Sequence, residues 1–259
     1  MGFYDVFLKN QHSDFVARLM VKLNEQLLNF LISKLSSKKA EIKVLEIGPG
    51  KGYFYKACVN HNYKNKIPYI DYFVMDRNKA ILDNIQVEKE KKFESQAPDL
   101  TPIINKAQKF DIVFVGFVIE HMRDGFEVYN FFKNISNIIQ TGGMAVFLCP
   151  NSVKLGMEFW NIDYTHIYPT TKRNVVMALR DTGINKVDVI DVNGLCYYRG
   201  FNNKVIYIFH RFLVMFYSYR LLNMVFGWFL SSKEYEIDNI FYRAFALLKE
   251  ENLMIIAYW

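Results

Sequence analysis

The chain has 259 residues, 51% of them hydrophobic, which suits one sizeable α/β domain with an elaboration. Its net charge of +6 favours acidic partners, but the basic residues are scattered and the aromatic residues concentrate after residue 197, so nucleic-acid binding is not expected. Cys58, Cys149 and Cys196 match no metal or redox motif, and residues 1–11 lack the apolar core of a secretory signal, so we expect a cytoplasmic protein with reduced thiols.

The hydrophobic pattern predicts an N-terminal helix followed by alternating strands and helices. Apolar residues recur at helical spacing over residues 13–36. Strands are expected at 42–47, 69–75, 93–96, 110–115 and 144–148, and helices at 53–59 and 125–139, with a turn at 141–143. After residue 151 we expect a loop, a helix over 170–180, a strand over 187–192 and a final strand over 251–259. This alternation is typical of a parallel sheet with helices on both faces.

A glycine-rich turn follows the first predicted strand and contains Gly48, Gly50 and Gly52. Glycine lets the backbone approach a ligand closely, and the N-terminus of the next helix directs N–H groups toward it. Asp76 ends the second predicted strand and Gly116 ends the fourth. Because open α/β sheets bind ligands at the carboxyl ends of their strands, we expect these positions to form one site.

The turn, read as Glu-Ile-Gly-Pro-Gly-Lys-Gly, resembles the first motif of class I S-adenosylmethionine-dependent methyltransferases. An NAD-dependent oxidoreductase is disfavoured, because the dinucleotide motif would place its third glycine at residue 53, which is Tyr. The resemblance spans about residues 40–195 and continues in segments 73–76, 110–115, 120–122 and 142–147. It implies a three-layer Rossmann-like sandwich with a seven-stranded, mostly parallel sheet whose last strand is antiparallel.

The resemblance also implies the residues that hold S-adenosylmethionine and its product S-adenosylhomocysteine. Glu46 would orient the methionine ammonium, and Asp76 would accept both ribose hydroxyls. Further cofactor contacts are expected at Gly48, Pro49, Gly50, Gly52, Tyr53, Arg77, Ser95, Gln96, Gly116, Phe117 and Ile119. Plainer roles stay open: a capping acid for Asp76, a solvated surface side chain for Arg77, and core packing for the last two positions.

Two histidines, His121 and His166, follow the fourth and fifth predicted strands and open onto the same edge of the sheet. If the acceptor is a hydroxyl, a base must take its proton, so both are candidate catalytic residues. The alternative for each is a structural role in starting a helix or orienting a loop. Trp160, Asp163 and Tyr164 are expected to line the acceptor site.

Glu120, His121 and His166 also resemble part of the metal site of RNA 3′-terminal 2′-O-methyltransferases. Those enzymes carry a further Glu where this chain has Phe117. Loss of a carboxylate removes both charge and a ligand from a hard-cation site, so no metal is expected.

Residues 205–230 are the most apolar part of the chain. Arg211 and Arg220 would each cost about 2.5 to 3.5 kcal/mol near a bilayer centre. We therefore expect amphipathic helices packed on the domain or on a second copy in a homodimer, with peripheral membrane contact as the alternative. The whole chain is expected to be one domain: a helical cap (1–40), a cofactor-binding core (41–195), an apolar helical insertion (196–238) and a terminal strand region (239–259).

The general layout is similar to bacterial methyltransferases of small molecules, quinones and glycan precursors. The resemblance implies an enzyme that O-methylates a small-molecule or sugar hydroxyl, for example in polysaccharide biosynthesis. Methyl transfer to a nitrogen or to a lipid or quinone stays open, as does a non-catalytic protein that binds S-adenosylmethionine or serves as a scaffold.

Overall fold

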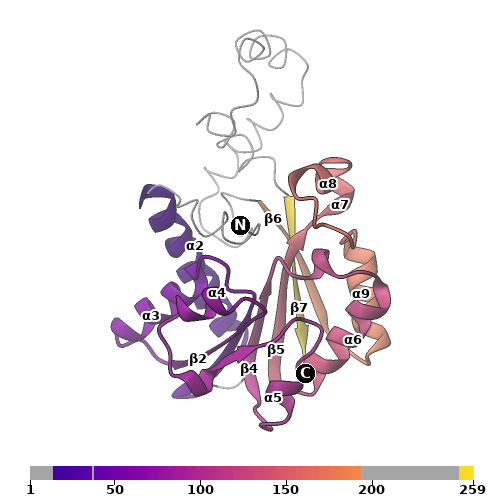
Figure 1. Ribbon diagram of the computed structural model, residues 1–259. Coiled ribbons are helices and arrows are strands. Elements are labelled where there is room, and N and C mark those ends of the chain that lie inside the picture. The colour runs from indigo at the N-terminus through magenta and orange to yellow at the C-terminus, as the bar shows by residue number, and fades with distance from the viewer. Residues whose placement is uncertain (1–13, 37, 194–250) are drawn as a thin grey trace, which may run out of the picture.

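The computed structural model describes residues 14–36, 38–193 and 251–259. In these ranges seven strands form one sheet with the order β3-β2-β1-β4-β5-β7-β6 (Figure 1). The parallel strands are β1 (Glu41–Ile47), β2 (Tyr69–Asp76), β3 (Lys92–Glu94), β4 (Phe110–Gly116) and β5 (Ile139–Pro150). β7 (Glu251–Tyr258) is antiparallel both to β5 and to β6 (Val187–Asn193). The sheet predicted from the resemblance is confirmed.

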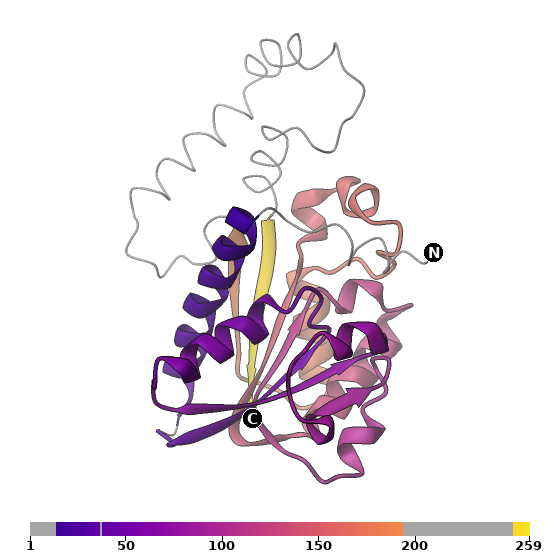
Figure 2. The same cartoon turned by 60° about the vertical axis from the view of Figure 1, so that its left-hand side comes forward.

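Helices cover both faces of this sheet and make the three layers (Figure 2). One face carries α2 (Asp14–Lys34), α3 (Tyr53–Tyr63) and α4 (Lys79–Asp83). The other carries α5 (Thr101–Ile104), α6 (Gly125–Ser136) and α9 (Lys172–Asp181). The remaining helical elements are η1 (Lys89–Lys91), η2 (Ile119–His121), α7 (Ser152–Leu155) and α8 (Glu158–Ile162).

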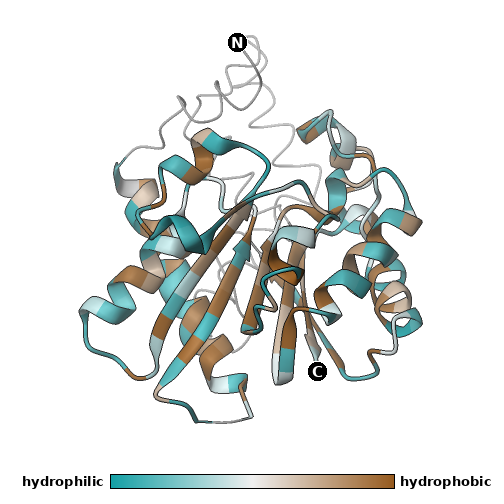
Figure 3. Cartoon of the chain, turned by 60° about the horizontal axis from the view of Figure 1, so that its bottom comes forward, coloured by the Kyte–Doolittle hydropathy of each residue, from teal (hydrophilic) through white to brown (hydrophobic). Residues whose placement is uncertain are grey.

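The strands read as continuous apolar runs because both of their faces are covered. In β1, Val44 packs into the cluster under α2 and α3, whereas its neighbour Leu45 packs into the cluster under α6 and α9. Residues 110–115 of β4 are all buried. Figure 3 shows the hydrophobic colour concentrated along the central strands. Successive side chains alternate between the two cores, so a strand with apolar residues at every position supplies both.

The helix α2 forms as the periodicity predicts, and it packs on one face of the sheet. Leu27, Leu28 and Leu31 occupy its inner face and are at most 1% exposed. Asp14 lies in its first turn and Lys34 in its last, which suits the charges at the two ends of the helix dipole.

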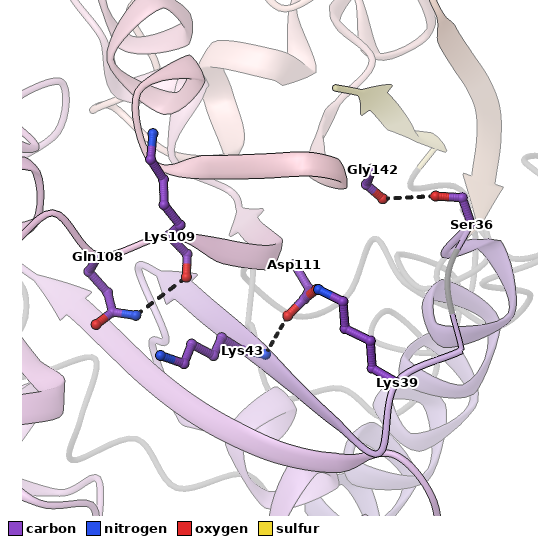
Figure 4. Close-up of polar contacts among 7 residues, drawn as sticks. All are labelled: Ser36, Lys39, Lys43, Gln108, Lys109, Asp111 and Gly142. Carbon is purple, nitrogen blue, oxygen red and sulfur yellow. Dashed lines mark hydrogen bonds and ion pairs between the residues drawn. The ribbon is translucent and has the colours of Figure 1, made fainter.

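Polar contacts tie the segment between α2 and β1 to the amino ends of the sheet strands (Figure 4). The buried carboxylate of Asp111 accepts bonds from Lys39 Nζ at 2.6 Å and from the backbone N–H of Lys43 at 2.8 Å. Ser36 Oγ donates to the carbonyl of Gly142 at 3.2 Å. These contacts lie at the end of the sheet opposite the carboxyl ends of the parallel strands.

Some parts of the chain differ from the sequence prediction. The third strand, expected over 93–96, is β3 at Lys92–Glu94. The helix expected to reach residue 139 ends at Ser136, and β5 begins at Ile139, so the expected turn at 141–143 is part of that strand. The register between β4 and β5 shifts between Phe110 and Ile112, which marks a strand irregularity in place of a turn. The expected loop after residue 151 contains α7 and α8.

The predicted apolar insertion at 196–238, with its segment 205–230, lies outside the described residues. Within the described ranges, no helix has both the length and the hydropathy that a membrane crossing requires.

Candidate active site

A cavity of about 780 Å³ opens at the carboxyl ends of the parallel strands, a size typical of small-molecule sites. It is lined by the turn after β1, by Asp76 and Arg77 after β2, by segment 95–97 after β3, by segment 116–118 after β4, and by Leu148 and Pro150 of β5. The strand ends that the sequence predicts to converge therefore share one cavity.

The turn after β1 requires residues without a Cβ. Gly48 has a φ of 75°, and a Cβ there would lie 2.7 Å from Cγ2 of Val118. Its N–H donates to the carbonyl of Met75 at 2.9 Å, which ties the turn to β2. Gly52, with a φ of 68°, precedes α3 and provides no side-chain cap, and the backbone N–H of Tyr55 in the first turn of α3 bonds to Glu46. The N-terminus of a helix suits an anionic group.

Asp76 lies where β2 ends, one strand away from this turn. Its Oδ1 accepts from the backbone N–H of Asn78 at 2.8 Å. Burial raises the pKa of Asp76, against the lowering effect of the Asn78 bond and of the Arg77 charge. The carboxyl group lines the cavity, and it can accept hydroxyl donors there.

Glu46 is enclosed by protein, and only 3% of its surface is exposed. Burial raises its pKa to about 7, a hydrogen bond from the hydroxyl of Tyr72 lowers it, and the charge of Asp76 raises it. A cationic group in the cavity would favour the ionised form. Sequence reasoning missed Tyr72, which could be found only from the β1–β2 register that pairs it with Val44.

The structure places most of the predicted cofactor residues on the cavity wall. Those that line it are Glu46, Gly48, Pro49, Gly50, Tyr53, Asp76, Arg77, Ser95, Gln96, Gly116 and Phe117. Two predicted residues, Gly52 and Ile119, do not line the cavity. Gly52 precedes α3, and Ile119 is 1% exposed and packs in the core with Met122.

The two predicted catalytic histidines lie together on the cavity wall, with ring centroids 5.1 Å apart. His121 Nδ1 lies 3.2 Å from the carbonyl oxygen of Thr165, and His166 Nδ1 lies 2.6 Å from that of Phe159. A carbonyl oxygen only accepts, so both Nδ1 atoms carry the proton in the neutral rings and both Nε2 atoms hold a lone pair. Burial lowers the pKa of His121, and the nearby His166 lowers it further. A neutral imidazole of this kind can accept a proton.

Glu120 is fully buried beside the two histidines. Among the described residues, neither of its carboxyl oxygens has a hydrogen-bond partner. Burial raises its pKa to about 8, so the group is mostly protonated at neutral pH. Ligand atoms of Glu120, His121 and His166 lie within 4.8 Å of one another. Ligand atoms of a tetrahedral metal site lie about 3.4 Å apart, so separations of up to 4.8 Å do not by themselves define a metal site. Metal independence stays a prediction.

The predicted acceptor residues divide between the cavity and the surface. Asp163 lines the cavity, whereas Trp160 and Tyr164 are 44% and 78% exposed and do not. Leu155 and Ile162 contribute the α7 and α8 part of the wall.

Several lining residues were missed by the sequence reasoning: Met20, Asn24, Lys51, Phe54, Val118, Arg123, Glu127 and Asn252. Met20 and Asn24 lie four residues apart on α2, so they share one helix face, but no local pattern marks that face as part of a site.

Comparison with known proteins agrees with this geometry. A family model described as a methyltransferase domain matches residues 16–189. A SAM-dependent methyltransferase from Archaeoglobus fulgidus superposes with a TM-score of 0.55 at 17% identity, over 99% of both chains. An S-adenosylmethionine-dependent methyltransferase from Clostridium acetobutylicum gives a TM-score of 0.52 at 10% identity, over 91% of this chain and 90% of the other.

These low identities show a shared fold. No curated protein matches the sequence. The family model covers more than half of the chain. Its match includes the glycine turn, Asp76 at the end of β2, and both histidines. The chain therefore belongs to the methyltransferase-domain family and is an α/β enzyme of the Rossmann-like methyltransferase class.

Proposed function

We propose that this enzyme transfers the methyl group of S-adenosylmethionine to a hydroxyl of a small-molecule or glycan-precursor acceptor. One observation carries the choice of a hydroxyl: two imidazoles, His121 and His166, each with Nδ1 held by a carbonyl, lie on the wall of the cavity. Acceptor hydroxyls are weakly acidic and need a base at the transition state, and an imidazole lone pair supplies one. The preference for a glycan precursor rests on the resemblance alone.

The residues of the cavity fit S-adenosylmethionine. Asp76 would accept the ribose hydroxyls, and Glu46, next to Tyr72, would face the ammonium of the methionine part. The glycine turn before α3, which lines the cavity, would lie beside its carboxylate. When bound, S-adenosylmethionine supplies a methyl group made electrophilic by the sulfonium charge.

The protein's own contribution is to align the acceptor and to manage one proton. The walls of the cavity would exclude water and hold the acceptor oxygen in line with the methyl group. As the new oxygen–carbon bond forms, the hydroxyl proton passes to Nε2 of His121 or His166. The proton then leaves to solvent through the open side of the cavity.

Cofactor binding is tested by calorimetry with S-adenosylhomocysteine, with NAD as the comparison ligand. We expect binding of the former, and Asp76→Ala should weaken it by about 10- to 100-fold, because two charge-assisted hydrogen bonds are lost. Asp83→Ala is the matched control, since Asp83 is exposed on α4 and outside the cavity lining. Equal affinity of wild type and Asp76→Ala, or preference for NAD, would contradict the assigned site.

Methyl transfer is tested with methyl-labelled S-adenosylmethionine and a fractionated cell extract as the source of acceptor. We expect a labelled O-methyl product, and His121→Ala and His166→Ala should each reduce its formation about 10²-fold or more while S-adenosylhomocysteine still binds. A labelled product methylated on nitrogen would refute the hydroxyl assignment. Undiminished transfer by both variants would return the histidines to a structural role.

A further inference from the structure

Thr165 lies between His121 and Asp163 in the loop after α8. Its Oγ1 is 2.9 Å from Nδ1 of His121 and 2.7 Å from Oδ1 of Asp163. The backbone N–H of Thr165 also donates to that same Oδ1, at 2.8 Å. Three side chains from two separate segments therefore form one hydrogen-bonded row that ends at the cavity.

The hydrogens of this row can be assigned by counting donors. A carboxylate only accepts, so the single hydroxyl hydrogen of Thr165 points to Asp163. Thr165 Oγ1 is then left with lone pairs toward His121, and the carbonyl of the same residue offers another acceptor. Nδ1 of His121 must be the donor to both, and Nε2 is the basic nitrogen.

We propose that Asp163 and Thr165 are positioning residues for His121: together they hold its ring in the tautomer whose Nε2 accepts the proton of the acceptor hydroxyl. This inference rests on the proposed function for the proton that Nε2 receives. The observed row of bonds does not depend on it. Asp163 was predicted to line the acceptor site; it lines the cavity, and its Oδ1 accepts from Thr165.

The electrostatics of the row favour the same arrangement. Burial raises the pKa of Asp163, but the bonds from Thr165 and the charges of His121 and His166 outweigh it and leave that pKa below its usual value. Asp163 is thus an anion at neutral pH, and its charge favours the imidazolium form of His121. Burial disfavours the imidazolium form of His121 most strongly, and the charges of His166 and Arg77 also lower the pKa of His121.

The chain contains a second copy of the same turn without a histidine, which separates a structural role from a positioning role. Asp99 Oδ1 accepts the backbone N–H of Thr101 at 2.9 Å, just as Asp163 accepts that of Thr165. Thr101 is exposed at the start of α5 and lies outside the cavity lining. Thr101→Val therefore removes an equivalent hydroxyl from an equivalent turn.

The test is nitrogen-15 and carbon-13 NMR of histidine-labelled protein saturated with S-adenosylhomocysteine. The chain has 5 histidines, so the signal of His121 can be assigned from its loss in His121→Gln. We expect the Nδ1–H tautomer for His121 in the wild type. Thr165→Val should reduce the population of that tautomer, Thr165→Ser should restore it, and Asp163→Asn should lower the pKa of His121 by about 0.5 to 1 unit.

Each outcome decides the proposal without knowledge of the acceptor. A His121 ring protonated on Nε2 in the wild type, or a tautomer and pKa unchanged in Thr165→Val and Asp163→Asn, would overturn it. Equal melting temperatures and S-adenosylhomocysteine affinities in Thr165→Val and Thr101→Val show that both variants fold. If the row is present but no O-methyl product is found, the proposed function fails and the tautomer assignment stands.

Discussion

Two carboxyl groups of the cavity, Glu46 and Glu120, are enclosed by protein, and burial raises the pKa of each into the neutral range. The sequence places both near strand ends, but it does not predict their protonation. Their protonation depends on how completely later parts of the chain cover them, and residue 120 also depends on the loop that carries Thr165 and His166. This is information that no local motif contains.

Glu120 makes stability depend on pH. Its pKa is about 8 in the folded protein and near 4.5 as an ordinary side chain. Below pH 4.5 Glu120 is protonated in both the folded and the unfolded protein. As the pH rises from 4.5 toward 8, Glu120 ionises first in the unfolded protein, so the free energy of unfolding falls across this window. At about 1.4 kcal/mol per pKa unit, the loss amounts to a few kcal/mol. Glu120→Gln should therefore lose less unfolding free energy between pH 5 and 8, as measured in urea.

Glu94→Gln is the control for this prediction, because Glu94 is exposed on β3. It should keep the wild-type pH dependence. The comparison uses the slope with pH, since the buried amide of Gln also lacks partners and lowers the absolute stability at every pH. Identical slopes for Glu120→Gln and wild type would rule out a raised pKa at this position.

Other parts of the site could be predicted residue by residue. Gly48 and Asp76 occupy positions whose chemistry follows from their place after a strand, so the sequence indicates them directly. Tyr72 and Thr165 act through partners in distant segments, 26 and 44 residues away in the chain. Their roles require the strand register and the loop geometry, which a single sequence does not supply.

At the level of elements, long periodic segments were predictable and short ones were not. The 21 residues of α2 and the apolar run of β4 carry clear periods. The helices α7 and α8 contain 4 and 5 residues, too few to show a helical repeat, so a loop was expected there. Both helices contribute to the candidate site, because Leu155 and Ile162 line the cavity.

The helix α2 has two tasks, since its inner face packs on the sheet and its Met20 and Asn24 reach the cavity. Leu28 is 0% exposed in that packing. Leu28→Ala should cost about 2 to 5 kcal/mol of unfolding free energy, because it leaves a cavity in a filled core. Arg18→Ala, on the exposed side of the same helix, should change the unfolding free energy by less than about 0.5 kcal/mol.

Urea unfolding of both variants checks this prediction. A loss in Leu28→Ala as small as that in Arg18→Ala would mean that α2 is not part of the cooperative core. If the prediction holds, a milder substitution such as Leu28→Val offers a way to loosen the cavity wall without unfolding the domain.

At the scale of the whole molecule, the architecture follows from the alternation of strands and helices together with the family resemblance. The position of the final strand could come only from the resemblance, because the hydrophobic pattern of β7 indicates a strand and says nothing about its neighbours. In the structure β7 is central to its half of the sheet, and residues 253–257 are all at most 1% exposed.

Deletion of residues 251–259 should abolish the folded state. It removes the ladder partner of both β5 and β6 and exposes the apolar surface beneath them. Circular dichroism and S-adenosylhomocysteine calorimetry measure the result, and Trp259→Ala, which keeps the strand, should still melt cooperatively. A truncated protein that retains a cooperative transition and binds the ligand would show that β7 is dispensable.

Because β7 inserts between two strands that precede it in the chain, the sheet cannot be completed while the ribosome still holds residues 251–259. A nascent chain emerging through β6 presents two open strand edges, with their backbone N–H and C=O groups free to pair with other chains. Translation therefore leaves an interval, between the synthesis of residue 193 and the emergence of residues 251–259 from the ribosome, in which these strand edges are unpaired. We therefore expect chaperones to protect the nascent chain until β7 pairs with both strands.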